Sequence, residues 1–345
     1  MRAAVCTKPF EIRLEEVADP EPKPDEVIVR VRATGVCGSD VRGYQGIHPE
    51  IKNYPVILGH EFAGEVAAVG GKADGWRVGQ RVTVEPITVD GTCAACLRGD
   101  YHLCDNLSLN GHQYPGSFAE YTTAKKRFTY PIPDSMTFEQ AAMIEPLAVC
   151  VHAVRISGVQ VGDFCLVLGG GTIGQLAAQV AVVAGATVML ADPFPFKREV
   201  AQRCGIHYSA DPFNENLETA IRERNGGELA DVVIEAAGAQ ESLAQSVHLV
   251  RKGGTIVPIG FTAQAEDRIN LTLVTIRELR LLGTVIYRGD YPRSIQLVEQ
   301  GRVQLEPLMT AFSTLEETEQ AIKTVIEARE RNIKSMIRPL SLIHI

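Results

Sequence analysis

Cysteine, histidine and glutamate side chains that can hold a metal ion stand at three separated places in the sequence. Cys37 lies in a glycine-flanked loop, His60 follows the apolar run 54–58, and Glu145 opens a Glu-Pro-Leu tripeptide. A thiolate, an imidazole and a carboxylate suit a catalytic zinc that keeps three protein ligands and one open coordination position. Glu61 adjoins His60 and either ligates the metal or orients a ligand. We therefore expect a catalytic zinc site, although each residue taken singly is more often a core residue.

A second metal-ligand pattern is confined to one short segment, in which three cysteines follow an aspartate. Its spacing is Asp90-x2-Cys93-x2-Cys96-x7-Cys104. Four-coordinate zinc needs closely spaced soft ligands, and a carboxylate can complete the tetrahedron. We expect a structural zinc held by these four residues, with lower affinity than a four-thiolate site because carboxylate is the harder ligand. The alternative is a lobe that folds without metal.

A glycine-rich turn indicates a dinucleotide site. Residues 169–174 fit G-x-G-x-x-G between an apolar strand and an uncharged helical stretch, an arrangement that brings a pyrophosphate to a helix N-terminus. Asp192 ends the next expected strand and can accept hydrogen bonds from a ribose 2′-hydroxyl, which favours NAD over NADP. The basic residues Lys197 and Arg198 either soften that preference or are plain solvated surface. The expected cofactor contacts are Gly169, Gly171, Thr172, Ile173, Gly174, Asp192 and Arg198.

Composition excludes several classes of protein. The chain has 345 residues, of which 45% are hydrophobic and 22% charged, and a formal net charge of −8, which is typical of a globular protein without nucleic-acid partners. No Asp, Glu, Lys or Arg occurs between Asp163 and Asp192, but glycines divide this stretch into strand, turn and helix, so we expect no membrane span. Sparse cysteines and an N-terminus without an apolar block indicate a cytoplasmic protein.

The sequence pattern changes near residue 161. Before about residue 90, short β-branched runs separated by Gly, Pro and Asp predict mostly antiparallel strands. From residue 161, repeated units of strand, glycine turn and helix predict a doubly wound parallel sheet. Its strands are expected at 164–168, 186–191, 231–237, 255–260 and 279–287. The end of the chain predicts a helix at 315–329 and an extended segment at 335–338.

These motifs, in this order, resemble the zinc-dependent medium-chain alcohol and polyol dehydrogenases. The likeness spans nearly the whole chain and is carried by 35–40, 59–66, 145–149 and 169–174, of which Glu145-Pro146-Leu147 looks most like the sorbitol dehydrogenase branch. The resemblance implies an α/β protein with a GroES-like, mostly-β catalytic domain at 1–150 and a Rossmann NAD-binding domain at 151–288. The segment 289–345 would complete the catalytic domain.

The resemblance also implies roles for individual residues. Cys37 and His60 would be zinc ligands, Glu61 and Glu145 would supply or assist the rest, and Asp40 would orient His60.

A proton relay is implied as well. Ser39 matches the family's relay hydroxyl, which takes the proton from the alcohol, although a loop-capping serine is the plain alternative. Arg42 stands where family members often have a histidine, and a guanidinium cannot act as a titrating base. His48 is a candidate substitute.

The leading hypothesis is a zinc-dependent, NAD-linked dehydrogenase of a polyol, cyclitol, sugar or other secondary alcohol. One alternative is a dehydrogenase of L-threonine or another amino alcohol, and a remote one is a non-catalytic dinucleotide-binding protein. Tyr287 and Arg288 lie in a segment near the substrate in polyol dehydrogenases, where Arg288 is either a substrate contact or a surface charge. The resemblance further implies a homodimer or homotetramer, for which 283–287 is a candidate edge strand.

Overall fold

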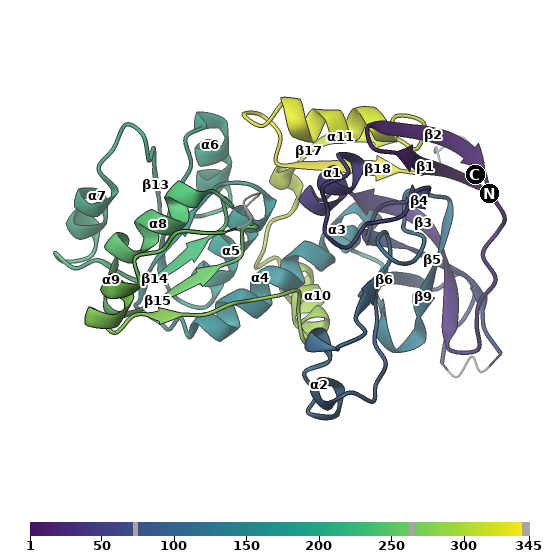
Figure 1. Ribbon diagram of the computed structural model, residues 1–345, viewed down its shortest axis with the longest axis horizontal. Coiled ribbons are helices and arrows are strands. Elements are labelled where there is room, and N and C mark those ends of the chain that lie inside the picture. Colours follow the sequence, from purple (N-terminus) through teal and green to yellow (C-terminus); the bar gives the residue numbers. More distant parts are fainter. Residues whose placement is uncertain (72–74, 262–265, 340–345) are drawn as a thin grey trace. The chain divides into compact units, whose positions relative to one another are not determined.

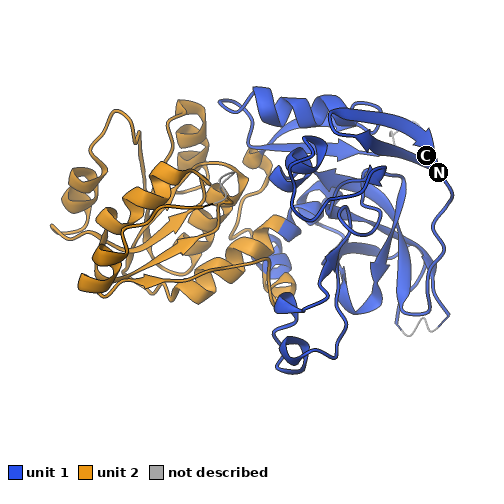
Figure 2. Cartoon of the chain, viewed as in Figure 1, with its two compact units in different colours: residues 1–145, 294–299, 309–345 blue, residues 146–293, 300–308 orange. Residues whose placement is uncertain are grey.

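The computed structural model describes residues 1–71, 75–261 and 266–339, and the chain divides into two compact units (Figures 1 and 2). Unit 1 comprises residues 1–145, 294–299 and 309–345, and unit 2 comprises residues 146–293 and 300–308. The first division falls between Glu145 and Pro146, inside α4 (Ile144–Ser157). The segment 300–308 belongs to unit 2, so only part of the predicted C-terminal segment joins unit 1.

Unit 1 is built on a seven-stranded sheet. Strands β10, β6, β5, β3, β18 and β17 lie side by side in that order, and β9 pairs with β3. Neighbours are antiparallel except β17 and β18, which run parallel. The strands are β3 (Glu26–Gly35), β5 (Glu61–Val69), β6 (Arg81–Val84), β9 (Tyr121–Lys125), β10 (Thr129–Pro131), β17 (Met309–Thr314) and β18 (Lys334–Arg338). The C-terminal strand β18 thus pairs with the end of β3, where the first metal-ligand segment begins.

Two smaller sheets and short helices complete unit 1. One sheet has the order β2-β1-β4, and β7 pairs with β8. Their bounds are β1 (Arg2–Lys8), β2 (Glu11–Glu16), β4 (Val56–Ile57), β7 (Ile87–Thr88) and β8 (Ser108–Leu109). The helices are α1 (Gly38–Tyr44), α2 (Ala94–Leu97), α3 (Phe138–Ala142) and α11 (Thr318–Glu327), with single 3-10 turns at 101–103 and 126–128. The helix predicted at 315–329 is therefore the shorter α11.

Unit 2 contains a six-stranded parallel sheet in the order β13-β12-β11-β14-β15-β16. The chain starts in the middle at β11 and winds outward in both directions, which is the Rossmann order that the sequence pattern predicts. The strands are β11 (Phe164–Leu168), β12 (Thr187–Ala191), β13 (Tyr208–Ala210), β14 (Ala230–Glu235), β15 (Val250–Pro258) and β16 (Arg280–Leu281). The helices are α5 (Thr172–Val183), α6 (Pro195–Arg203), α7 (Leu217–Arg224), α8 (Gln240–Leu249) and α9 (Leu271–Ile276), and α10 (Tyr291–Glu299) begins in unit 2 and continues into unit 1.

The last strand of this sheet is shorter than the sequence indicates. Residues 283–287 form no strand, so the prediction of an edge strand there is wrong, and β16 is the edge. β16 pairs with β15 only at Arg280 and Leu281, and farther along Ile286 has a left-handed backbone (φ 38°) that does not fit an extended strand.

Each unit has its own apolar core. In unit 2 every residue of β11 is buried, as expected for a central parallel strand covered on both faces. In unit 1 one core lies between β3, β5 and β6 around Phe62, and another gathers Leu58, Phe118 and Ile322. These cores fix the ends of β3 and β5, where the metal-ligand residues stand.

Candidate functional site

Three metal-ligand side chains meet in unit 1. Cys37 is the residue before the first turn of α1, His60 precedes β5, and Glu61 is the first residue of β5. One donor atom from each lies within 4.8 Å of the other two, and His60 and Glu61 are buried. Pairing of Gly35 with Glu61 brings the end of β3, and hence Cys37, to the start of β5. Thiolate, imidazole and carboxylate at this spacing fit a zinc ion.

Asp40 fixes the orientation of the histidine. It is fully buried, and its carboxylate accepts hydrogen bonds from the backbone N–H of Cys37 (2.8 Å) and Gly59 (2.9 Å). Nδ1 of His60 lies 3.5 Å from Oδ1 of Asp40, which leaves Nε2 toward the cluster. Burial alone would lower the pKa of His60, but Asp40 and Cys37 raise that pKa well above its usual value. Metal binding must therefore displace a proton from this ring.

Glu61 is held by a lysine from the other end of the sequence. Nζ of Lys334, the first residue of β18, donates to Oε1 (2.8 Å) and Oε2 (2.6 Å) of Glu61 and to the carbonyl of Val36 (3.1 Å). Both side chains of this ion pair are only 2% exposed. A side chain at Gly35 would collide with Oε2 of Glu61, so the close pairing requires glycine there.

Glu145 is not a member of this three-residue cluster. It is buried in the first turn of α4, and its carboxylate interacts electrostatically with the ammonium group of Lys334. Burial alone would lower the pKa of Lys334, but Glu61, Cys37 and Glu145 raise it, so the ammonium stays charged. The two carboxylates thus differ: Glu61 belongs to the group of donors with Cys37 and His60 and is paired with Lys334, whereas Glu145 is not in that group.

A row of imidazoles extends from the cluster. The ring centroids of His60 and His112 are 5.6 Å apart, and those of His112 and His48 are 4.5 Å apart. Burial lowers the pKa of His112 to about 3, so this ring is neutral. Ser39 places its Oγ 3.4 Å from Nε2 of His60, and Arg42 lies in the last turn of α1.

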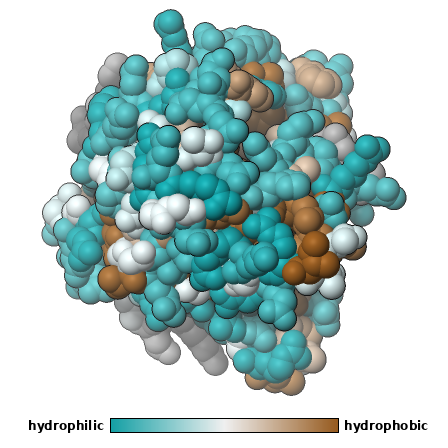
Figure 3. All heavy atoms as spheres, turned by 90° about the vertical axis from the view of Figure 1, so that its left-hand side faces the viewer, coloured by the Kyte–Doolittle hydropathy of each residue, from teal (hydrophilic) through white to brown (hydrophobic). Residues whose placement is uncertain are grey.

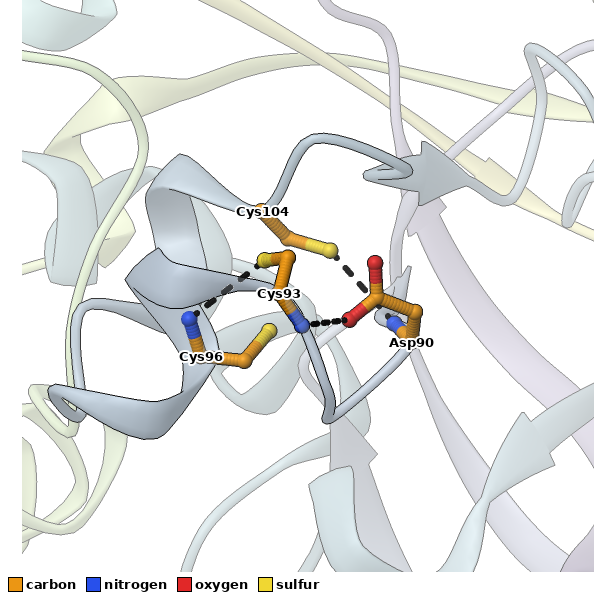
Figure 4. Close-up of side chains that lie close together, drawn as sticks. All are labelled: Asp90, Cys93, Cys96 and Cys104. Atoms are coloured by element: carbon orange, nitrogen blue, oxygen red, sulfur yellow. Dashed lines mark hydrogen bonds between the residues drawn. The ribbon is translucent and has the colours of Figure 1, made fainter.

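The second cluster lies in a separate loop of unit 1 (Figure 4). Donor atoms of Asp90, Cys93, Cys96 and Cys104 all lie within 4.8 Å of one another. Oδ1 of Asp90 accepts from the backbone N–H of Thr92 (2.7 Å) and Cys93 (2.9 Å), and these donors hold the pKa of the carboxyl well below its usual range. The loop closes because Cys104 Sγ accepts from Asp90 N (3.4 Å). Three thiols and an ionised carboxylate are a suitable donor set for zinc.

The glycine turn of unit 2 has the shape that a pyrophosphate needs. Gly169 has φ 101°, which favours glycine, and a side chain at Gly174 would collide with the carbonyl of Gly169. At Gly171, the residue before α5, an added Cβ would meet nothing within 4 Å. The turn is thus tight on one side and open above the helix N-terminus, where Thr172 and Ile173 form the first turn.

The acidic residue after β12 is tied to this turn. Asp192 is buried; its Oδ2 accepts from Gly170 N (2.7 Å) and its Oδ1 from Phe194 N (2.9 Å). Nη1 of Arg198 donates to the carbonyl of Asp192 (2.7 Å) and to Oδ2 of Asp211 (3.2 Å). The Arg198 guanidinium therefore already has hydrogen-bond partners within the protein.

Comparison with known proteins decides the family. Residues 23–134 match the alcohol dehydrogenase GroES-like domain, and residues 172–300 match the zinc-binding dehydrogenase domain. The chain is 34% identical to sorbitol dehydrogenase of Bacillus subtilis (98% of this chain, 97% of the relative) and 35% identical to D-xylulose reductase of Saccharomyces cerevisiae (97% of both). The chain belongs to the zinc-binding alcohol dehydrogenase family.

A solved structure of this family supports the same assignment. A candidate zinc-binding dehydrogenase from Sinorhizobium meliloti 1021, bound to NADP, superposes with a TM-score of 0.92 at 34% identity, covering 98% of this chain and 99% of that one. This zinc-binding alcohol dehydrogenase relative confirms the predicted fold class, a GroES-like domain plus a Rossmann domain. A zinc ion and a nicotinamide dinucleotide are accordingly the cofactors of the family to which the chain belongs.

Sequence reasoning missed Lys334. It lies 273 residues from Glu61 along the chain, and a lysine at the start of a strand carries no signal of burial. The contact of His112 with His60 has no sequence signature either. Tyr287, expected near the substrate, is buried against Tyr291 in unit 2, with ring centroids 5.1 Å apart.

Proposed function

We propose that the protein oxidises a secondary alcohol of the polyol class and transfers the hydride to NAD. The observation that carries this proposal is the cluster of Cys37, His60 and Glu61, with its donor atoms within 4.8 Å of one another. Zinc held by such a cluster acts as a Lewis acid that lowers the pKa of a substrate hydroxyl and orients it. NAD accepts the hydride.

The residues around the cluster keep its charge and geometry fixed. The carboxylate of Asp40, itself held by two backbone N–H groups, lies 3.5 Å from Nδ1 of His60 and favours the ring orientation that directs Nε2 to the cluster. Lys334 neutralises Glu61 and engages both of its oxygens. We therefore assign Cys37 and His60 as metal ligands. Glu61, the nearest carboxylate, is the proposed third ligand, and Glu145 is the alternative.

Ser39 is the residue that we assign to proton removal. Its hydroxyl stands beside the metal-binding face of His60, at 3.4 Å from Nε2, within reach of a hydroxyl bound at the cluster. Arg42 cannot continue the relay because a guanidinium does not give up its proton. His48, whose ring packs against that of His112 at a tilt of 56°, is our candidate for the group that passes the proton outward.

NAD rather than NADP is the proposed cofactor. The buried carboxylate of Asp192 adjoins the glycine turn and would repel a 2′-phosphate. Arg198 does not offset this repulsion because Asp211 already neutralises it. Gly169, Gly171, Thr172, Ile173 and Gly174 are the proposed pyrophosphate contacts.

We propose a second, structural zinc at Asp90, Cys93, Cys96 and Cys104. The mutual approach of the four donor atoms and the lowered pKa of Asp90 support it. A carboxylate that is ionised at every physiological pH can serve as the fourth ligand without first losing a proton.

We also propose a homodimer or homotetramer that pairs copies of unit 2 at the edge strand β16. Leu271, Ile276 and Leu281, which lie in α9 and β16, are exposed apolar residues at that edge. Figure 3 shows groups of apolar side chains on a mainly hydrophilic face.

None of the helices in the described parts of the chain combines the length and the apolar character that a bilayer crossing needs.

A substrate panel tests the proposed function. Zinc-replete protein is mixed with NAD and, in turn, sorbitol, xylitol, inositol, a free sugar and L-threonine, and NADH formation is followed. We expect turnover with a polyol and little with L-threonine. Turnover with L-threonine alone would support the amino-alcohol alternative, and bound zinc and NAD without turnover of any alcohol would favour a non-catalytic protein.

A further inference from the structure

A buried glutamine supports the glycine turn of unit 2. Gln175 lies at the end of the first turn of α5 and is fully buried, although most of the buried residues of that helix are apolar. Its Nε2 donates to the carbonyl of Gly170 (3.3 Å) and to the carbonyl of Lys197 (2.8 Å). One side chain therefore joins three segments: α5, the glycine turn and the first turn of α6.

The amide oxygen of the same side chain contributes no hydrogen bond. Oε1 of Gln175 is buried and has no hydrogen-bond partner among the described residues. A buried acceptor without a partner costs free energy, and this cost is of the same order as the gain from the two donated hydrogen bonds. An apolar side chain of the same length would therefore fold about as well. The advantage of Gln175 must lie in what its two hydrogen bonds hold in place.

The turn residue that Gln175 holds is also the one that contacts Asp192. Gly170 N donates to Oδ2 of Asp192 (2.7 Å). An added Cβ at Gly170 would lie 3.1 Å from the Cβ atoms of both Asp192 and Lys197, so the turn packs closely against these two side chains. Nζ of Lys197 lies 3.9 Å from Oδ2 of Asp192, and both side chains are largely buried. Gln175 thus holds together the turn, the carboxylate and the ammonium group.

We propose that Gln175 is a positioning residue that gives the dinucleotide site its preference for NAD over NADP. Its two hydrogen bonds keep the turn against Asp192, where the carboxylate can accept from a ribose 2′-hydroxyl and repels a 2′-phosphate. Without them the turn and α6 can separate, so the carboxylate loses its fixed position while the charge of Lys197 still attracts a phosphate. The inference rests on the proposed choice of NAD and traces that choice to a fully buried residue.

The test compares two glutamines of the same helix. Gln175→Met keeps an unbranched side chain and removes both donated hydrogen bonds. Gln179→Met is the matched control, because Gln179 is also buried on α5 but exchanges hydrogen bonds with the backbone of Gln304 (2.7 and 3.1 Å) and not with the turn. The readout is the dissociation constant of NADPH divided by that of NADH, measured by calorimetry on zinc-replete protein without alcohol, with the thermal midpoint of every variant.

We expect Gln175→Met to weaken NADH binding about tenfold, the effect of one hydrogen bond, and to lower the NADPH/NADH ratio about fivefold. Its thermal midpoint should stay within about 3 °C of that of the wild type. Gln179→Met should lower the thermal midpoint and leave the ratio unchanged.

A wild-type ratio in Gln175→Met would overturn the proposal. An equal fall of the ratio in Gln179→Met would also overturn it, because the effect would then come from the packing of α5. If Gln175→Met does not fold, Gln175→Asn makes the same comparison, since its amide is one methylene short of the two carbonyls.

A double variant tests whether Gln175 acts through Asp192. In the Asp192→Asn background the repulsion of a 2′-phosphate is already removed, so adding Gln175→Met should change the ratio by less than about twofold. If the two effects on the ratio multiply, as they do for independent sites, action through Asp192 is excluded. A wild type that binds NADPH at least as tightly as NADH would refute the proposed choice of NAD itself. That result differs from failure of the positioning role, in which the wild type and Gln175→Met prefer NADH to the same degree.

Discussion

Removing Lys334 should destabilise unit 1 because it leaves the charge of Glu61 buried without a partner. Three hydrogen bonds from Nζ end on Glu61 and Val36, and the two ion-paired side chains are 2% exposed. Breaking a buried ion pair by deleting one partner costs about 3 to 5 kcal/mol. We therefore expect Lys334→Met, which conserves length without charge, to lower the free energy of unfolding by that amount.

A double-mutant cycle separates the ion pair from simple packing. Glu61→Gln removes the carboxylate charge, so Lys334→Met in that background should cost at least about 2 kcal/mol less than in the wild type. The assay is urea unfolding of chelator-treated protein followed by the fluorescence of Trp76, the single tryptophan, which packs against the core of unit 1. If the loss of unfolding free energy in the double mutant equals the sum of the two single-mutant losses within about 0.5 kcal/mol, the reasoning is refuted. Lys334 would then contribute only through its aliphatic stem.

Four further perturbations have defined outcomes. Ser39→Ala should lower turnover by about a hundredfold with unchanged zinc content, and wild-type turnover would exclude it from proton transfer. Cys96→Ser should reduce metal content from two zinc ions per chain to one by elemental analysis, whereas one ion in both proteins would mean that the loop folds without metal. Asp192→Asn, which keeps acceptor oxygen for Gly170 N, should raise the ratio of kcat/KM for NADP over NAD about tenfold; an unchanged ratio would remove Asp192 from cofactor choice. Burial alone would raise the pKa of Asp290, but hydrogen bonds from His152 and other donors lower it. Asp290→Asn should therefore lower the free energy of unfolding by about 2 kcal/mol at neutral pH, and this loss should disappear as the pH falls below about 4 through the lowered pKa. A loss of stability that does not change with pH would contradict this.

The parts of the site that are local in sequence could be predicted, and the parts made by long-range packing could not. The glycine turn and Asp192 are separated by one strand-helix unit, and the four donors from Asp90 to Cys104 lie in one loop, so residue type and spacing suffice to place them together. Cys37 and His60 lie farther apart, so their residue types, supported by the family resemblance, rather than their spacing suggested that they share one zinc. The role of Lys334 depends on the pairing of β18 with β3, and the sequence alone does not indicate which strand a C-terminal segment joins.

The choice between the two glutamates shows the same limit. From the sequence alone, Glu61 and Glu145 were equal candidates beside Cys37 and His60. The structure separates them, since Glu61 lies within the cluster and is ion-paired with Lys334, and Glu145 lies outside it. The end of the Rossmann sheet could not be predicted either, because residue types would extend the last strand to Tyr287, whereas β16 pairs only at Arg280 and Leu281.

The central claim is that the Cys37–His60–Glu61 cluster holds a zinc ion that binds a polyol hydroxyl while NAD oxidises the polyol. Its most direct test is a cycle of metal removal and return. NADH formation from sorbitol or xylitol is measured on purified protein, after chelation, and after zinc is restored, with NAD binding followed at each stage. The account predicts that turnover is lost on chelation and regained with zinc, while NAD remains bound throughout. Undiminished turnover in protein shown by elemental analysis to be free of metal would contradict it.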